Sequence, residues 1–187
     1  MKKPLKVIIT GGPGTGKSSM VNLLQQKGFR CEKEMAREVI REQMRLGTNL
    51  VPWEDLPGYS RLVFDRISAV SEQANQYPLT IFDRSALDVI AYLTHAGIAV
   101  PEYMSKQIHQ MGFHPTVFFA PYWNEIYTSD GERKESPALA KEISETIGNT
   151  YLSYGFHIIE LPKQSVLERT KIVEDYLEKE AARNEHV

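Results

Sequence analysis

A glycine-rich segment near the N-terminus limits the possible folds of this chain more than any other part of its sequence. The segment reads Gly11-Gly12-Pro13-Gly14-Thr15-Gly16-Lys17-Ser18 and fits the pattern G-x-x-x-x-G-K-[ST] in full. Its glycines allow the backbone to wrap closely around phosphate groups and to point successive N–H groups toward them. The segment lies between a predicted strand and a predicted helix, whose N-terminus adds partial positive charge. The sequence therefore predicts a loop that binds the phosphates of a nucleoside triphosphate.

The side chains of this loop have separate expected roles. Lys17 is expected to reach the β- and γ-phosphates, and the Ser18 hydroxyl is expected to bind Mg²⁺. The nucleotide is expected to be ATP or GTP, and the sequence has no Asn-Lys-x-Asp tetrapeptide of the kind that reads guanine, which favours ATP. The predicted nucleotide-binding residues are Gly11, Gly12, Pro13, Gly14, Thr15, Gly16, Lys17, Ser18 and the adjoining Ser19.

Short apolar runs alternate with amphipathic helical segments along the whole chain. The runs predicted as strands cover residues 5–10, 29–32, 79–82, 116–120 and 156–161. This alternation predicts an α/β fold with a five-stranded parallel sheet and helices on both faces. The 187 residues are expected to form a single domain, residues 1–187. Ligands of such sheets bind at the carboxyl ends of the strands, which is where the glycine-rich loop falls.

Local signals predict several helix ends. Gly28 closes the helix that follows the glycine-rich loop, and a loop with two prolines covers residues 47–58. A helix is predicted over residues 84–96, and Pro101 is expected at the first position of the next helix. Ser165 and Glu168 form a capping box for the last helix.

Composition excludes some classes of function. The 22 basic and 24 acidic residues give a net charge of −2, which is not the electrostatic footprint of a nucleic-acid-binding protein. No stretch approaches the ~20 apolar residues that a membrane span requires. Cys31 is the single cysteine, so an internal disulfide is impossible and a cytoplasmic location is expected. The sequence does not indicate an oligomeric state.

Asp83 and Arg84 follow the third predicted strand, at the same edge of the sheet as the glycine-rich loop. Asp83 is expected to hold Mg²⁺, directly or through water; the alternative is that it caps the next helix. Arg84 is expected to neutralise charge that develops on the phosphates during transfer. The alternative for Arg84 is a surface ion pair with Asp88, four residues along the helix.

Glu34 and Arg37 follow the second predicted strand and share a helix face. This pair is the candidate binding site for a polar small-molecule acceptor. Glu34 is also a candidate general base toward an acceptor hydroxyl. The alternative is an exposed ion pair. The sequence leaves open whether Glu34 or Asp83 is the general base.

Residues 122–136 contain Asp130, Arg133 and Lys134 in a polar loop before a helix. The pattern is that of a mobile lid that brings cations to the phosphates, and Arg133 is the candidate catalytic cation. An ordinary surface loop is the alternative. The aromatic residues Trp53, Tyr59, Tyr122 and Trp123 are candidates for stacking on a base, although packing is the expected role.

These motifs together resemble a known family. The glycine-rich loop and the segments that begin at Glu34, Asp83 and Asp130 look like the AAA-type P-loop domain that forms the ribosylnicotinamide kinase part of the bifunctional bacterial NAD-biosynthesis regulator. The resemblance covers roughly residues 7–177. Asp83-Arg84-Ser85 is also similar to the Asp/Glu-Arg-Ser segment of deoxynucleoside kinases, which implies an acid for Mg²⁺ and an arginine for the phosphates. The regulator's adenylyltransferase and DNA-binding domains are absent from this sequence, as are the arginine finger and helical lid of ring-forming AAA+ machines.

The leading hypothesis from the sequence is a kinase that transfers the γ-phosphoryl group of ATP·Mg²⁺ to the hydroxyl of a nucleoside-like acceptor. A regulatory switch that binds ATP or GTP and hydrolyses it slowly is the rival hypothesis. A toxin-like kinase acting on a cell-wall precursor is a third. The sequence does not identify the acceptor.

Overall fold

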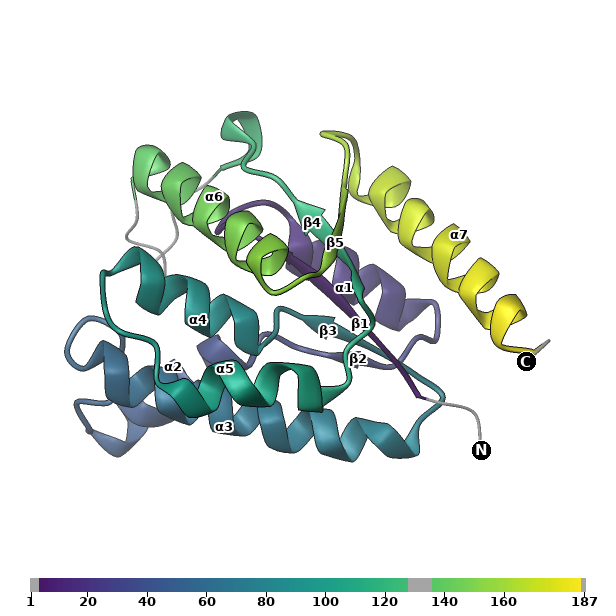
Figure 1. Cartoon of the computed structure of the whole chain (residues 1–187). Coiled ribbons are helices and arrows are strands. Elements are labelled where there is room, and N and C mark those ends of the chain that lie inside the picture. The colour runs from purple at the N-terminus through teal and green to yellow at the C-terminus, as the bar shows by residue number, and fades with distance from the viewer. Residues whose placement is uncertain (1–3, 128–135, 186–187) are drawn as a thin grey trace.

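The computed structural model describes residues 4–127 and 136–185, which form a parallel sheet with helices on both faces (Figure 1). The strand order is β2-β3-β1-β4-β5, and every pairing in the sheet is parallel. The strands are β1 (Leu5–Gly11), β2 (Cys31–Glu32), β3 (Leu79–Asp83), β4 (Thr116–Ala120) and β5 (His157–Glu160). The helices are α1 (Lys17–Gln26), α2 (Met35–Leu46), α3 (Leu56–Gln73), α4 (Ala86–His95), α5 (Glu102–Ile108), α6 (Pro137–Ser153) and α7 (Val166–Glu185). The predicted fold class is confirmed.

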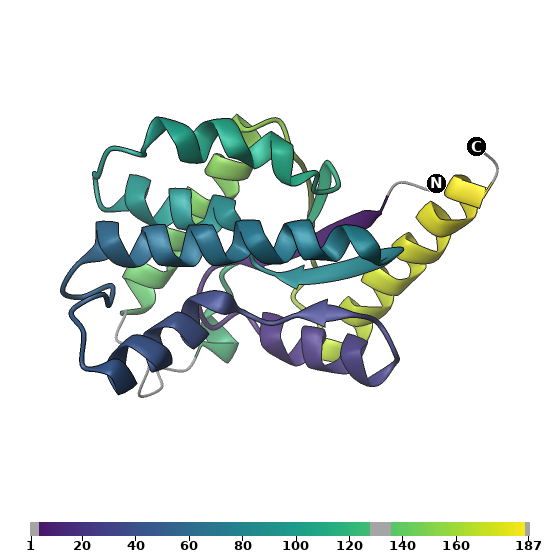
Figure 2. The same ribbon diagram turned by 90° about the horizontal axis from the view of Figure 1, so that it is seen from below.

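Apolar side chains alternate between the two faces of the central strand. In β1, Val7 and Ile9 pack with α1 and α7 on one face, whereas Ile8 packs with α2 to α6 on the other. Figure 2 shows α1 and α3 on opposite sides of the sheet. Since both faces of β1 are covered, the strand reads as a continuous apolar run. Two apolar layers therefore hold its carboxyl end, where the glycine-rich loop begins.

The boundaries of several elements differ from the predictions. Arg84 has a left-handed backbone, so α4 begins at Ala86 after the cap Ser85. Pro101 is the N-cap of α5 and not its first residue, and β2 has only two residues. None of the helices formed by the described residues is long and apolar enough to span a membrane.

The strand order determines which segments meet at the edge of the sheet that carries the loop. β3 lies between β1 and β2, and the register pairs Ile9 with Asp83. The loop after β1 is therefore next to Asp83, and Glu34 reaches this region from across the end of β3.

Candidate functional site

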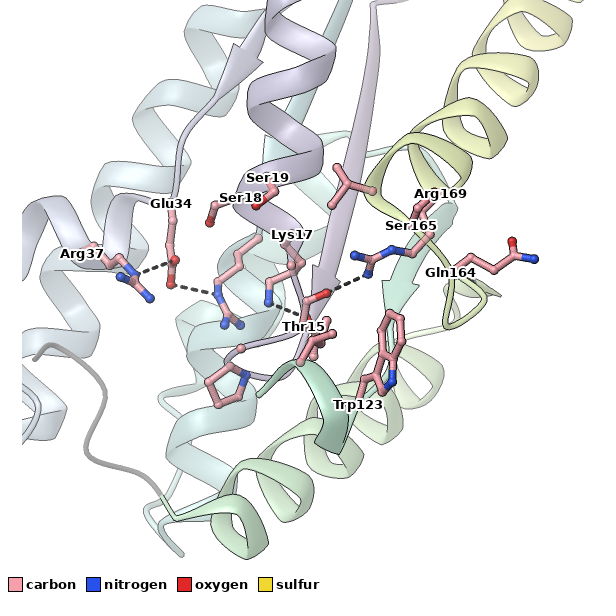
Figure 3. A pocket seen from close by; sticks show the side chains of 16 residues that line it. Thr15, Lys17, Ser18, Ser19, Glu34, Arg37, Trp123, Gln164, Ser165 and Arg169 are labelled. Carbon is pink, nitrogen blue, oxygen red and sulfur yellow. Dashed lines mark hydrogen bonds and ion pairs between the residues drawn. The ribbon is translucent and has the colours of Figure 1, made fainter. Parts of the chain in front are cut away.

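A cavity of about 410 Å³ lies at the carboxyl ends of the strands, around the glycine-rich loop (Figure 3). Three groups of residues line the cavity. They are the glycine-rich loop, the charged residues Glu34, Arg37 and Arg84 at one end, and residues that follow β4 and β5 at the other end. The lining residues are Pro13, Gly14, Thr15, Gly16, Lys17, Ser18, Ser19, Glu34, Arg37, Arg84, Trp123, Ile126, Gln164, Ser165, Val166 and Arg169. In Figure 3, Glu34 and Arg37 lie on one side of Lys17, and Trp123, Gln164 and Arg169 lie on the other.

The loop backbone requires glycine where it turns into α1. Gly16 is the N-cap of α1 with a φ of 79°, in the left-handed region that disfavours other residues. A Cβ atom at Gly16 would lie 2.6 Å from a terminal guanidinium nitrogen of Arg169. The first residues of α1 line the cavity, so the helix N-terminus faces it, as anion binding requires. Gly11 and Gly12 do not line the cavity. Gly11 ends β1 in register with Ala120, and Gly12 lies against Ser144 of α6.

Lys17 is held inside the loop. Its Nζ donates hydrogen bonds to the Gly12 carbonyl oxygen at 2.6 Å and to Thr15 Oγ1 at 3.1 Å. Burial, together with the nearby Arg84 guanidinium, lowers the pKa of Lys17 to about 7. An anionic ligand beside Nζ would therefore strongly favour the charged ammonium.

Asp83 and Ser18 face each other across the end of β3. Ser18 Oγ donates to Asp83 Oδ2 at 3.2 Å, whereas the buried Oδ1 has no hydrogen-bond partner among the described residues. Burial raises the pKa of Asp83 to about 6. The alternative of a helix cap is wrong for Asp83, because Ser85 caps α4 and forms a capping box with Asp88.

This pair fits a magnesium ion. Mg²⁺ takes oxygen ligands, keeps several waters, and is usually held by one or two carboxylates together with substrate phosphates. Ser18 Oγ and the Asp83 carboxylate supply oxygens of this kind beside the phosphate loop, and the unpaired Oδ1 has remaining acceptor capacity.

Arg84 is buried and not on the surface. Its Nε donates to Glu34 Oε1 at 3.0 Å, and one terminal nitrogen donates to Asp88 Oδ1 at 2.9 Å. The predicted pair with Asp88 therefore exists, but both side chains are less than a tenth exposed. Arg84 also has a φ of 70°, which costs about 1–3 kcal/mol for such a residue and persists only where the surroundings enforce it.

Glu34 and Arg37 form the charged end of the cavity. Glu34 immediately precedes α2, and its Oε2 accepts a hydrogen bond from Arg37 Nε at 3.0 Å. Glu34 therefore lies between two guanidinium groups, those of Arg37 and Arg84. The exposed fractions of the Glu34 and Arg37 side chains are 16% and 25%, so this is a partly buried pair at the cavity wall and not a solvated surface pair.

The opposite end of the cavity contains residues that the sequence did not single out. Arg169 donates a hydrogen bond from a terminal nitrogen to the Thr15 carbonyl oxygen at 2.7 Å, and its guanidinium lies 5.8 Å from the centre of the Trp123 ring. The available signal was the position of Arg169 in the first turn of α7, the helix that follows β5. Trp123 was only one of four aromatic candidates, of which Trp53, Tyr59 and Tyr122 do not line this cavity.

Two further buried polar residues went unnoticed in the sequence. Thr10 Oγ1 and the Tyr151 hydroxyl both donate to the carboxylate of Asp88, at 2.6 Å and 2.7 Å. Asp130, Arg133 and Lys134, the predicted lid residues, lie outside the described residues, so a role for Arg133 stays a prediction.

The parallel sheet in the order β2-β3-β1-β4-β5, with a glycine-rich loop at the end of its central strand, defines a P-loop domain of the nucleoside-kinase kind. Residues 6–169 match the family described as "AAA domain", and the chain belongs to this family. No curated protein sequence matches the chain.

Solved structures of similar fold include several kinases. A deoxyadenosine kinase from M. mycoides with the products dCMP and dCDP has a TM-score of 0.67 at 14% identity, covering 94% of this chain and 100% of that chain. The NadR protein in complex with NR has a TM-score of 0.65 at 15% identity, covering 94% of this chain and 50% of that chain. A shikimate kinase from Aquifex aeolicus has a TM-score of 0.58 at 19% identity, covering 95% and 98%. At these identities the likeness shows the fold, and the resemblance expected from the sequence is confirmed.

Proposed function

We propose that this protein is a small-molecule kinase that transfers the γ-phosphoryl group of ATP to the hydroxyl of a nucleoside-like acceptor. The observation that carries this proposal is a single cavity that joins the phosphate loop to a partly buried carboxylate, Glu34, flanked by two guanidinium groups. A protein that only binds and slowly hydrolyses a nucleotide needs no base for an acceptor hydroxyl. The kinases of similar fold support the same class of reaction.

The donor nucleotide would lie along the loop. Its phosphates would accept hydrogen bonds from loop N–H groups and from Lys17, and its base and ribose would lie toward Trp123, Gln164 and Arg169. Ser18 and Asp83 would hold Mg²⁺, which neutralises charge on the β- and γ-phosphates when it is bound. The absence of a guanine-reading tetrapeptide from the sequence favours ATP over GTP.

The acceptor would lie at the charged end. Glu34 would accept a hydrogen bond from the acceptor hydroxyl and then its proton, as the hydroxyl oxygen bonds to the γ-phosphorus and the bond from that phosphorus to ADP breaks. Arg84 would stabilise the charge on the transferring phosphoryl group, since such catalysis rests mainly on positioning and electrostatics. Arg37 would orient Glu34 or bind the acceptor directly.

An acceptor panel tests this proposal. Purified protein is incubated with ATP and Mg²⁺ in the presence of individual nucleosides and sugars, and ADP formation is compared with a control without acceptor. A kinase should give at least one acceptor-dependent rate, on the order of 1–100 s⁻¹ for an efficient substrate, together with a phosphorylated product visible by mass spectrometry. Slow ADP formation that no acceptor increases would contradict the proposal and support a regulatory switch.

A further inference from the structure

Five charged or hydroxyl-bearing residues form a chain of contacts that leads from the cavity wall into the interior. Arg84 contacts Glu34 at the cavity wall and Asp88 in the interior, through different nitrogens of the same guanidinium group. Asp88 in turn contacts Thr10 of β1 and Tyr151 of α6. The chain of contacts therefore runs from Thr10 at the carboxyl end of the central strand, through Asp88 of α4 and Arg84, to Glu34 at the proposed acceptor site.

Asp88 is the centre of this chain. Its Oδ1 accepts hydrogen bonds from Thr10 Oγ1 at 2.6 Å and from Arg84 at 2.9 Å. Its Oδ2 accepts from the Ser85 backbone N–H at 2.9 Å and from the Tyr151 hydroxyl at 2.7 Å. The side chain is 5% exposed. A carboxylate with four donors, from β1, from the turn before α4 and from α6, is fixed in position, and a buried charge needs this degree of satisfaction.

Arg84 needs such an anchor. In the described part of the chain it is the one non-glycine residue with a positive φ, and its backbone N–H donates to the Ile9 carbonyl oxygen at 2.9 Å. An arginine side chain has many rotamers, and Glu34 alone would hold only one of its nitrogens. The second contact, to Asp88, therefore restricts the guanidinium to one orientation at the boundary between the phosphate loop and Glu34.

We infer that Asp88 is a positioning residue, which holds the Arg84 guanidinium in place for the transferring phosphoryl group although Asp88 itself touches no substrate. The inference rests on the proposed role of Arg84 and does not depend on the identity of the acceptor. Without the Asp88 carboxylate, Arg84 keeps its charge but loses the contact that sets its direction. Binding of the ground-state nucleotide should change little, whereas binding of a transition-state mimic should weaken.

The test measures two affinities for each variant by calorimetry: that for ADP·Mg²⁺, and that for ADP·Mg²⁺ with aluminium fluoride as a mimic of the transferring phosphoryl group. Asp88→Asn should leave ADP·Mg²⁺ affinity within about threefold. It should weaken the aluminium fluoride complex by about 10- to 100-fold, the scale expected from a misplaced catalytic group. Asp88→Glu keeps the charge but moves the carboxylate, and it should weaken the same complex; it carries the test if Asp88→Asn does not fold.

A double-mutant cycle shows whether Asp88 acts through Arg84. In the Arg84→Gln background, Asp88→Asn should cause no additional loss of affinity for the aluminium fluoride complex. Tyr151→Phe is the matched control, because it removes one hydrogen bond from Asp88 but keeps the carboxylate and its contact with Arg84. This control should lower the Tm while affinity for the mimic stays within about threefold.

Three results would overturn the inference. The first is equal weakening of both nucleotide complexes by the folded Asp88 variants, which would indicate general disruption. The second is an additional loss in the Arg84→Gln background. The third is unchanged affinity for the mimic in a folded Asp88 variant. None of these results depends on phosphoryl transfer to an acceptor, so the inference can fail while the kinase proposal stands, and the reverse also holds.

Discussion

Lys17 and Asp83 lie close to Ser18, and burial acts against the charge of both. Burial lowers the pKa of Lys17 and raises the pKa of Asp83, so desolvation favours the neutral form of each group. The attraction between the two charged groups opposes both effects of burial, because Asp83 raises the pKa of Lys17 and Lys17 lowers the pKa of Asp83. A polyphosphate beside Lys17 and a cation beside Asp83 would stabilise both charged forms at once. Binding of a nucleotide together with its metal is therefore better suited to this site than binding of either alone.

Replacement of Lys17 tests whether the glycine-rich loop binds the phosphates of ATP. Lys17→Ala removes a charge-assisted hydrogen bond of about 1.5–3 kcal/mol, so affinity for ATP·Mg²⁺ should fall roughly 10- to 100-fold. Lys171→Ala, which changes an exposed lysine on α7, should leave the affinity unchanged. Calorimetry measures both variants, and an unchanged affinity in Lys17→Ala would contradict the phosphate-loop assignment.

Replacement of Asp83 tests the magnesium assignment. Asp83→Asn keeps the shape of the side chain but removes its charge, so the Mg²⁺ concentration needed for half-maximal ADP formation should rise and turnover should fall. Nucleotide binding in EDTA should change far less. Asp65→Asn, at an exposed position on α3, is the control. Full activity at the normal Mg²⁺ concentration would show that Asp83 is not a ligand.

The single cysteine gives a pH-dependent prediction. Burial raises the pKa of the Cys31 thiol from its ordinary value of 9.0 to about 11. At pH 8 the native protein should therefore be alkylated by iodoacetamide about 100-fold more slowly than the unfolded protein, because the thiolate is the reactive form. The native rate should keep rising with pH up to about 11. Since the unfolded thiol loses its proton first, this group reduces native stability as the pH rises above 9.0. Equal alkylation rates of native and unfolded protein at pH 8 would refute the shift.

Residues within a local motif were predictable, and residues that meet through tertiary contacts were not. Lys17 and Ser18 belong to a continuous pattern, and Glu34 with Arg37 is a helical i, i+3 pair. In contrast, Arg169 reaches Thr15 across 154 residues of sequence, and Tyr151 reaches Asp88 across 63. The sequence around Arg169 or Tyr151 contains no motif that predicts which distant residue each side chain contacts.

At the scale of elements, α4 shows why its start was predicted two residues too early. The sequence analysis placed the start of this helix directly after the strand, so Arg84 was assigned to the helix. The backbone turns left-handed at Arg84, and the helix begins only after Ser85, whose side chain accepts a hydrogen bond from the Leu87 N–H. Strands bounded by glycine or proline were located well, whereas β2 is short and lies at the edge of the sheet, where fewer apolar residues mark its ends.

Ser85 and Ser165 each form a capping box, which allows a matched comparison. Ser85→Ala removes the cap of α4 and also the buried contact between Ser85 Oγ and the Tyr151 hydroxyl at 2.6 Å. Ser165→Ala removes the exposed cap of α7. We expect the free energy of unfolding to fall by about 1–3 kcal/mol for Ser85→Ala and by about 0.5–1 kcal/mol for Ser165→Ala. Urea denaturation measures both, and a larger loss for Ser165→Ala would contradict the buried network around Ser85.

At the scale of the whole molecule, the cavity is assembled from the carboxyl ends of all five strands. The phosphate loop follows β1, Glu34 follows β2 and Arg84 follows β3, while Trp123 and Gln164 follow β4 and β5. The alternation of strands and helices in the sequence predicted this convergence in general terms. The order of the strands determines which residues meet in the cavity. It places β3 between the glycine-rich loop and Glu34, so Arg84, which follows β3, lies between them and contacts Glu34.

The most direct test of the proposed kinase is phosphoryl transfer by Glu34→Gln, measured beside ATP affinity in the same preparation. With an acceptor found by the panel, Glu34→Gln should abolish acceptor-dependent transfer, because the amide cannot take the proton of the hydroxyl. ATP·Mg²⁺ affinity should stay within about threefold, or ~0.65 kcal/mol. Glu38→Gln, at an exposed position on α2, should retain wild-type transfer. Wild-type turnover in Glu34→Gln would contradict the account, as it would show that phosphoryl transfer does not need this carboxylate.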